Sequence, residues 1–219
     1  MAFSFQNDLS AEREQMVRTQ LADRAIRDAR VLDAMRAVSR HEFLPAEFRD
    51  RAYEDHPLPI GEGQTISQPY IVAVMLQHLA LRSTDRVLEV GTGSGYVTAL
   101  LSVLCASVFS IERHATLAES ARAALQRMGC ENVQIRVGDG TLGWPERAPF
   151  DAILVSAATP AIPPALFEQL NPEGRMVLPV GPPLTQELQL IRKLNGRAAA
   201  TTLEACRFVP LVPGPPEAT

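Results

Sequence analysis

The sequence predicts an α/β fold with a doubly wound, mostly parallel sheet, preceded by helices and closed by an antiparallel hairpin. From Arg86 onward, short β-rich runs alternate with helical runs, which is typical of a parallel sheet covered on both faces. The last two strand-like runs are joined by a short polar turn, which indicates antiparallel pairing. With 219 residues, of which 46% are hydrophobic, the chain can bury one sizeable core.

The first part of the chain is predicted to be helical. Residues 10–38 show helical periodicity with many charges, and Asp28 is a suitable N-cap for the second helix, ARVLDAMRAV. Prolines and glycines crowd into residues 43–63, which predicts irregular connecting structure. A helix is expected from Pro69 to about Leu81, because proline is favoured in the first turn of a helix.

The alternating region supplies the predicted sheet. Its runs in chain order are RVLEVG, YVTALLSVLC, VFSIE, TLAESARAALQRM, VQIRVGD, FDAILVSAA, PALFEQL and RMVLPVG. Two more strand-like runs, ELQLIRKL and LEACRFVPLV, flank Asn195-Gly196, a dipeptide typical of tight hairpins. We expect this pair to form the edge of the sheet. The closing PGPPEAT cannot pack a core, so residues 213–219 are predicted to be a flexible tail.

The composition argues against several classes of partner. A formal net charge of −4 disfavours nucleic acid and anionic lipid, since binding to either normally needs a basic face. The N-terminus does not resemble a secretory signal, and no apolar run is long enough to span a bilayer. We therefore expect a cytoplasmic protein. Cys105, Cys130 and Cys206 lack metal or redox spacing and are predicted to be buried, reduced thiols, and the four scattered histidines predict no metal site either.

A glycine-rich loop is the first candidate for ligand binding. In LEVGTGSGYVTALL, Gly91, Gly93 and Gly95 follow an apolar strand and open a helix, where the backbone can approach a ligand and helix N-terminal amides are available. Tyr96 stands where a dinucleotide fingerprint has its third glycine, so a pyrophosphate ligand is disfavoured. A role in packing alone is the alternative for these glycines.

Acidic residues follow the loop at the ends of neighbouring strands. Glu112 ends the next strand and is placed to accept hydrogen bonds from two ribose hydroxyls, and Asp139 in GDG ends the one after and is placed to accept from an adenine amino group. Glu89 adds one more acid just before the loop. Such a surplus of acids repels phosphates and suits a cationic ligand. S-adenosylmethionine, a sulfonium nucleoside with an ammonium group, meets each of these requirements.

Along nearly its whole length the chain resembles the protein-L-isoaspartate O-methyltransferases. The resemblance lies in RVLDAMRAVSRHEFLP, YEDHPLPIGEGQTISQPYIVA, VLEVGTGSGY, SIER, GDGTLGWPERAPFDAILVSAA, IPPAL and RFVPLV, and PLPIG-x-GQTIS-x-P is similar to this family's own signature. It implies a class I methyltransferase fold with extra N-terminal helices. The implied activity is S-adenosylmethionine-dependent methyl esterification of the free carboxylate of L-isoaspartyl residues in damaged proteins and peptides, which starts their repair.

The resemblance also implies roles for individual residues. Ser67 matches the active-site position, in a turn that lies over cofactor and substrate. The positions implied for cofactor binding are Gln64, Thr65, Ile66, Glu89, Gly91, Gly93, Gly95, Glu112, Asp139 and Gly140. Val97, the stretch GPPLTQE and Val212 depart from the family's usual residues, so no role is implied for them.

Three parts of the chain are expected on this basis. Residues 1–66 would form an N-terminal helical extension with the substrate-side turn, residues 67–212 the S-adenosylmethionine-dependent methyltransferase domain, and residues 213–219 the tail. We expect a monomer that acts on isoaspartyl-containing proteins and peptides.

The predicted chemistry needs no general base. A carboxylic acid with a pKa near ~4 is already an anion at neutral pH, so the protein has only to align the acceptor oxygen with an activated methyl group and exclude water. Ser67 and free amides of the glycine-containing turn are suited to hold such an anion. The alternative for Ser67 is an ordinary N-cap of the helix that follows.

Other functions stay open at this stage. A class I methyltransferase could act on another carboxylate or on a small-molecule acceptor, although the GQTIS turn argues against it. A nicotinamide-dependent oxidoreductase is disfavoured by the G-x-G-x-G spacing and by the lack of an obvious proton donor. A module that binds S-adenosylmethionine without turnover is the third alternative.

Overall fold

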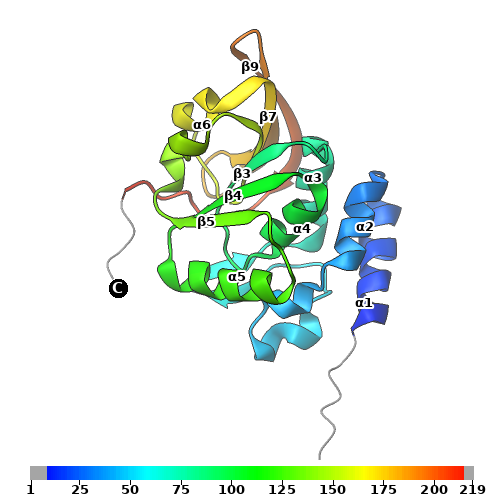
Figure 1. The fold of residues 1–219 in the computed structure, drawn as a ribbon. Coiled ribbons are helices and arrows are strands. Elements are labelled where there is room, and N and C mark those ends of the chain that lie inside the picture. The colour runs from blue at the N-terminus through cyan, green and yellow to red at the C-terminus, as the bar shows by residue number, and fades with distance from the viewer. Residues whose placement is uncertain (1–8, 215–219) are drawn as a thin grey trace, which may run out of the picture.

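The structure, a computed structural model, describes residues 9–214. A seven-stranded sheet with the order β5-β4-β3-β6-β7-β8-β9 forms its centre (Figure 1). The strands are β3 (Arg86–Val90), β4 (Ser107–Glu112), β5 (Val133–Val137), β6 (Phe150–Val155), β7 (Leu170–Val180), β8 (Gln186–Leu194) and β9 (Arg197–Cys206). Strands β3 to β7 pair in parallel, whereas β8 is antiparallel to both β7 and β9. The predicted mostly parallel sheet with an antiparallel C-terminal hairpin is confirmed.

Helices cover both faces of this sheet, as the alternating pattern predicts. They are α1 (Ser10–Gln15), α2 (Ala29–Ala37), α3 (Pro69–Leu79), α4 (Tyr96–Leu104), α5 (Ala115–Arg127) and α6 (Pro164–Glu168). Helices α3 to α5 cover one face and α6 the other, while α1 and α2 pack outside α3 and α4 (Figure 1). A π-helical segment, Met16–Leu21, continues α1.

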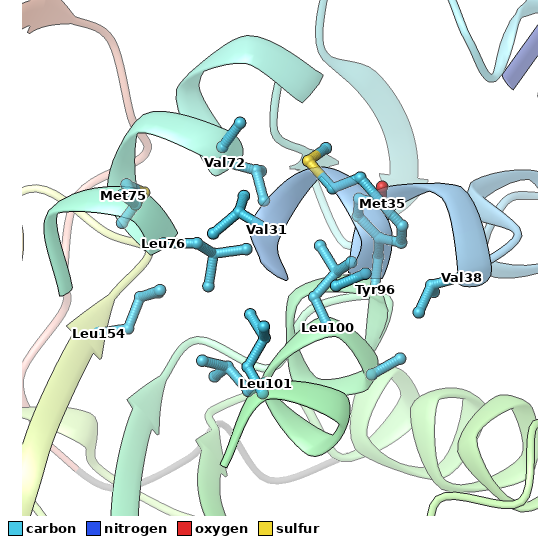
Figure 2. Close-up of a cluster of buried hydrophobic side chains, with 14 of the residues drawn as sticks. Val31, Met35, Val38, Val72, Met75, Leu76, Tyr96, Leu100, Leu101 and Leu154 are labelled. Carbon is cyan, nitrogen blue, oxygen red and sulfur yellow. The ribbon is translucent and has the colours of Figure 1, made fainter. Parts of the chain in front are cut away.

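The strands divide their side chains between two hydrophobic clusters. In β3, Val87 belongs to the cluster under α2 to α5, and Leu88 belongs to the cluster under α6. From Ala152 onward, strand β6 alternates in the same way, because successive side chains of a strand point to opposite faces. Figure 2 shows part of the larger cluster, where side chains of α2, α3, α4 and β6 meet: Val31, Met35, Val72, Leu76, Leu100, Leu101 and Leu154.

Two helix starts follow from local sequence chemistry. The Asp28 side chain accepts hydrogen bonds from the backbone N–H groups of Arg30 and Val31, so its prediction as an N-cap is confirmed. Helix α3 starts at Pro69 and ends before Ala80, which adopts φ +46°, two residues short of the predicted end.

The segment before α3 differs from the prediction. Residues 43–63 are not wholly irregular, because β1 (Leu58–Gly61) and β2 (Gln64–Ile66) form an antiparallel hairpin. Its tip, Glu62 and Gly63, has φ values of +51° and +65°, the positive pair that a two-residue hairpin turn needs. The strands are too short, and too rich in proline and glycine, to show an alternating pattern.

The C-terminal hairpin turns at Asn195 and Gly196, with φ values of +51° and +76°, as predicted. Strand β9 ends at Cys206, so the later half of LEACRFVPLV leaves the sheet. Gly214 of the predicted tail is held against the molecule by donating its N–H to Asp139 Oδ2, and residues 215–219 lie outside the described part of the chain. No helix within residues 9–214 is long and apolar enough to cross a membrane.

Candidate cofactor and substrate site

A cavity of about 260 Å³ lies at the carboxyl ends of β3, β4 and β6. Strand β3 is flanked by β4 on one side and β6 on the other, so this is the point where the order of the parallel strands switches and where open α/β sheets bind ligands. The lining comes from residues 64–67, 90–94, 96–97, 111–114, 140, 156–157 and 209–212. Most of the predicted site residues therefore meet in one place.

The glycine loop forms one wall of this cavity. Gly91 and Gly93 line it with φ values of +93° and +53°, a conformation that favours glycine. Gly95 does not line it. This residue has φ +90° at the start of α4, and a Cβ there would lie 3.1 Å from Cβ of Ala121 on α5. The packing alternative therefore describes Gly95, and the ligand-facing prediction describes the other two.

Glu112 lies at the cavity with its carboxylate fixed by the backbone. Oε2 accepts from Gly93 N–H at 2.7 Å and Oε1 accepts from His114 N–H at 2.9 Å. The side chain is only 5% exposed. Each carboxylate oxygen can accept a second hydrogen bond, so the acid that was predicted to hold ribose hydroxyls is in place and pre-oriented.

Glu89 is not brought to the cavity surface. Its side chain is fully buried, and Oε2 accepts from Thr98 Oγ1 and Ser110 Oγ, both at 2.6 Å, while Oε1 has no partner within residues 9–214. Burial raises the pKa of Glu89 to about 8, against the lowering effect of the two hydroxyl bonds and with a smaller raising effect from Glu112. The direct contact implied for Glu89 is therefore not what this geometry shows.

The strand register explains the position of Glu89. It shares a face of β3 with Val87, two residues earlier, and this face packs against α4. Glu89 is linked to the cavity only through other side chains. The Ser110 hydroxyl that donates to Glu89 also lies 2.5 Å from Oγ1 of Thr92, and Thr92 lines the cavity.

Asp139 is likewise engaged within the protein. Oδ1 accepts from the backbone N–H and the hydroxyl of Thr141 at 2.8 and 2.6 Å, and Oδ2 accepts from Gly214 N–H at 2.7 Å. Burial alone would raise the pKa of Asp139, but these hydrogen bonds outweigh it and lower the pKa. Gly140 lines the cavity and Asp139 does not, so direct adenine binding by Asp139 is not what the geometry shows either.

The C-terminal segment is a part of the site that sequence reasoning missed. Residues 209–212 line the cavity. Ala158 holds them through Ala158 N–H to Val209 O and Leu211 N–H to Ala158 O, both 2.8 Å, and Arg113 donates to the carbonyls of Val212 and Gly214. The sequence predicted a strand over residues 203–212 and a tail over residues 213–219, because no sequence signal marks a segment that leaves the sheet to cover a cavity.

The Gln64–Ser67 turn closes the opposite side. Ser67 is half-buried and its hydroxyl makes no hydrogen bond to any other residue of the described chain. The N-cap position of α3 is Gln68, without a side-chain cap, so the N-cap alternative for Ser67 is wrong. Thr65 is exposed, and Ile66 is 3% exposed and anchors the turn in the core.

A second cavity, of about 420 Å³, adjoins the first. Thr65, Ser67, Ser156 and Val209 line both cavities, so these four residues mark the junction. The other walls of the second cavity are Pro57, Gln68, Ile71 and residues 205–208. Within residues 9–214, no group of three or more metal-ligating side chains is gathered.

Comparison with known proteins agrees with this arrangement. Residues 11–215 match the family model described as protein-L-isoaspartate(D-aspartate) O-methyltransferase. Protein-L-isoaspartate O-methyltransferases of Koribacter versatilis and Methylorubrum extorquens are 55% and 57% identical, over 92% and 94% of this chain and 90% and 91% of theirs.

Two solved structures are similar as well. A protein-L-isoaspartate O-methyltransferase has a TM-score of 0.82 at 31% identity, over 90% of this chain, which spans 65% of that one. A β-aspartate methyltransferase of Plasmodium falciparum, solved with S-adenosyl-L-homocysteine, has a TM-score of 0.81 at 27% identity, over 91% of this chain and 98% of that one.

The fold is that of a class I methyltransferase, as the sequence predicts. Within that class, the chain belongs to the family of protein-L-isoaspartate (D-aspartate) O-methyltransferases. The predicted family, fold class and type of enzyme are thereby confirmed.

Proposed function

We propose that this chain transfers the methyl group of S-adenosylmethionine to the free carboxylate of L-isoaspartyl residues in damaged proteins and peptides, the first step of their repair. The observation that carries the proposal is the pair of joined cavities. One is bordered by the glycine loop and Glu112, and the other opens on the far side of Ser67.

The residues of the first cavity fit a cationic nucleoside. Glu112 offers a fixed carboxylate, Gly91 and Gly93 allow close approach of the backbone, and apolar side chains such as Leu211 supply a surface for a base. We assign cofactor contacts to these residues, to Gly140 and to the Gln64–Ile66 turn. Indirect roles are assigned to Glu89, Gly95 and Asp139. Glu89 holds α4, Gly95 lets the loop pack against α5, and Asp139 holds the C-terminal segment.

The acceptor site is assigned to the junction of the two cavities. S-adenosylmethionine supplies a methyl group activated by the neighbouring sulfonium. Ser67 Oγ–H donates to the acceptor carboxylate there and orients one of its oxygens, and the walls of both cavities exclude water from it. An acceptor that is already ionised needs no general base.

Further parts of the proposal concern the whole chain. We propose that residues 67–212 carry the methyltransferase domain and residues 1–66 the extension, although one hydrophobic cluster runs through both. The three cysteines are free, with Cys105 buried as predicted and Cys130 and Cys206 only partly buried, and free thiols fit a reducing, cytoplasmic environment. The net charge of −4 fits the absence of a nucleic acid or anionic membrane partner. We propose a monomer.

The test uses labelled S-adenosylmethionine and two peptides that differ only in having isoaspartate or normal aspartate at one position. Base-labile label on the isoaspartyl peptide alone is expected, because a methyl ester is hydrolysed by base. Label on both peptides would indicate an acceptor of another kind. Label on neither peptide, with the cofactor analogue bound, would favour a binding module.

A further inference from the structure

We propose that Arg207 is a specificity-determining residue that favours substrates with an acidic side chain next to the acceptor residue. The inference rests on the proposed function and concerns the second cavity, which Arg207 lines.

The geometry of the two cavities separates Arg207 from the acceptor. The methyl donor is assigned to the first cavity, so the acceptor oxygen must lie at the junction formed by Thr65, Ser67, Ser156 and Val209. Arg207 lines the second cavity only, and it is exposed. A group that reaches its guanidinium therefore belongs to a residue beside the acceptor rather than to the acceptor itself.

The charge of Arg207 has no counterpart among residues 9–214. Its guanidinium makes no ion pair or hydrogen bond with any residue between 9 and 214, whereas Arg24, Arg136 and Arg175 each pair with a carboxylate. Arg207 is also the one charged side chain among the described residues that line the second cavity. A carboxylate is its natural complement, because a guanidinium can donate two parallel hydrogen bonds to it.

The backbone next to Arg207 is held in place. Phe208 N–H donates to Gln186 Oε1 at 2.6 Å, and Gln186 Nε2 donates to Phe208 O at 3.1 Å. Gln186 is itself 5% exposed, so this amide clamp is shielded from water. The root of the Arg207 side chain is therefore pre-positioned at the cavity, which lowers the ordering cost of binding a partner.

The experiment compares two isoaspartyl peptides, one with Glu and one with Gln on both sides of the acceptor. Wild type should show a roughly 2- to 5-fold higher kcat/KM for the Glu peptide, mainly through KM, as an exposed charge pair would give. Arg207→Gln should bring the ratio close to one, Arg207→Glu should invert it, and Arg207→Lys should keep part of it. The wild-type preference should shrink as salt is raised.

The matched control is Arg197→Gln, which removes the same charge from an exposed position at the other end of β9 and should leave the ratio unchanged. Fluorescence anisotropy of the labelled peptides, with S-adenosyl-L-homocysteine present, should show the same preference in Kd. If wild type shows no preference, or if Arg207→Gln keeps the wild-type ratio, the inference about Arg207 is overturned. Methylation of both peptides would in that case still support the proposed function. If neither peptide is methylated, both proposals fail.

Discussion

Replacing Glu112 should weaken cofactor binding, because this residue holds both the glycine loop and, by our assignment, the cofactor. Glu112→Ala removes the acceptor of two backbone N–H groups, from Gly93 and His114, together with the acceptor assigned to the ligand. Hydrogen bonds to a charged group contribute about 1.5–3 kcal/mol each, although water entering the cavity will replace part of this. We expect a loss of about 1–3 kcal/mol in binding of S-adenosyl-L-homocysteine, which is a roughly 5- to 150-fold rise in Kd.

Isothermal titration calorimetry measures this directly, and thermal unfolding shows whether the variant is folded. Glu112→Gln keeps one carbonyl oxygen for one of the two N–H groups, so it should fall between wild type and the alanine variant. Glu119→Gln on α5 changes the same charge at an exposed position away from the cavity and should bind normally. A folded Glu112→Ala protein with a Kd within about twofold of wild type would remove Glu112 from the cofactor site.

Three further predictions concern the other parts of the site. Ser67→Ala should lower kcat/KM by about 10-fold or more, equivalent to about 1.4 kcal/mol, while calorimetry finds cofactor affinity unchanged; wild-type turnover would contradict the assignment. Gly95→Ala should lower the free energy of unfolding by about 1–3 kcal/mol more than Gly129→Ala. Both glycines have positive φ, but of these two positions only residue 95 would place its Cβ within 4 Å of a neighbour. Equal melting temperatures of the two variants would refute this. Burial raises the pKa of Glu89 from its ordinary value of 4.5 to about 8, so the folded state holds the proton more tightly than the unfolded state. The stability that this proton binding contributes is fully present below pH 4.5 and is lost as the pH rises through 8. Denaturant unfolding should therefore show that the free energy of unfolding of the isosteric Glu89→Gln variant, relative to wild type, increases between pH 5 and 8 by on the order of a few kcal/mol. A constant difference across that range would mean that Glu89 does not titrate there.

Much of the fold could be predicted because its signals are local. The parallel strands are short runs rich in β-branched and other apolar residues that alternate with helical runs, Asp28 and Pro69 mark helix starts, and Asn195-Gly196 marks the last hairpin. The hairpin at residues 58–66 gave no such signal, because its strands are three and four residues long and its glycines and prolines are also typical of loops.

The site was predicted in outline but not in its inner contacts. That Gly91, Gly93 and Glu112 meet at one edge follows from strand order, since the carboxyl ends of parallel strands lie together. Whether an acid at that edge faces a ligand or the protein depends on register and on distant segments. Glu89 turns toward α4, and Asp139 is engaged by Gly214, a residue 75 positions away along the chain that no local pattern connects to it.

The distribution of charge suits the proposed reaction, which joins a cation and an anion and leaves two neutral products. Because both charges decrease as the transition state forms, a charged side chain at the junction would stabilise the ground state more than the transition state and slow the transfer. The residues that line both cavities are all neutral, and three of them, Thr65, Ser67 and Ser156, carry hydroxyls. The charged groups stand to either side. The donor cavity has the Glu112 carboxylate and also Arg113, whose guanidinium donates to the carbonyls of Val212 and Gly214, and the other cavity has the Arg207 guanidinium. Glu112 and Arg207 can therefore attract a cation and an anion to opposite sides of the junction without opposing the loss of charge between them. Steady-state kinetics should accordingly show that Ser67→Lys has a lower KM for the acceptor peptide, yet a lower kcat, than Ser67→Ala.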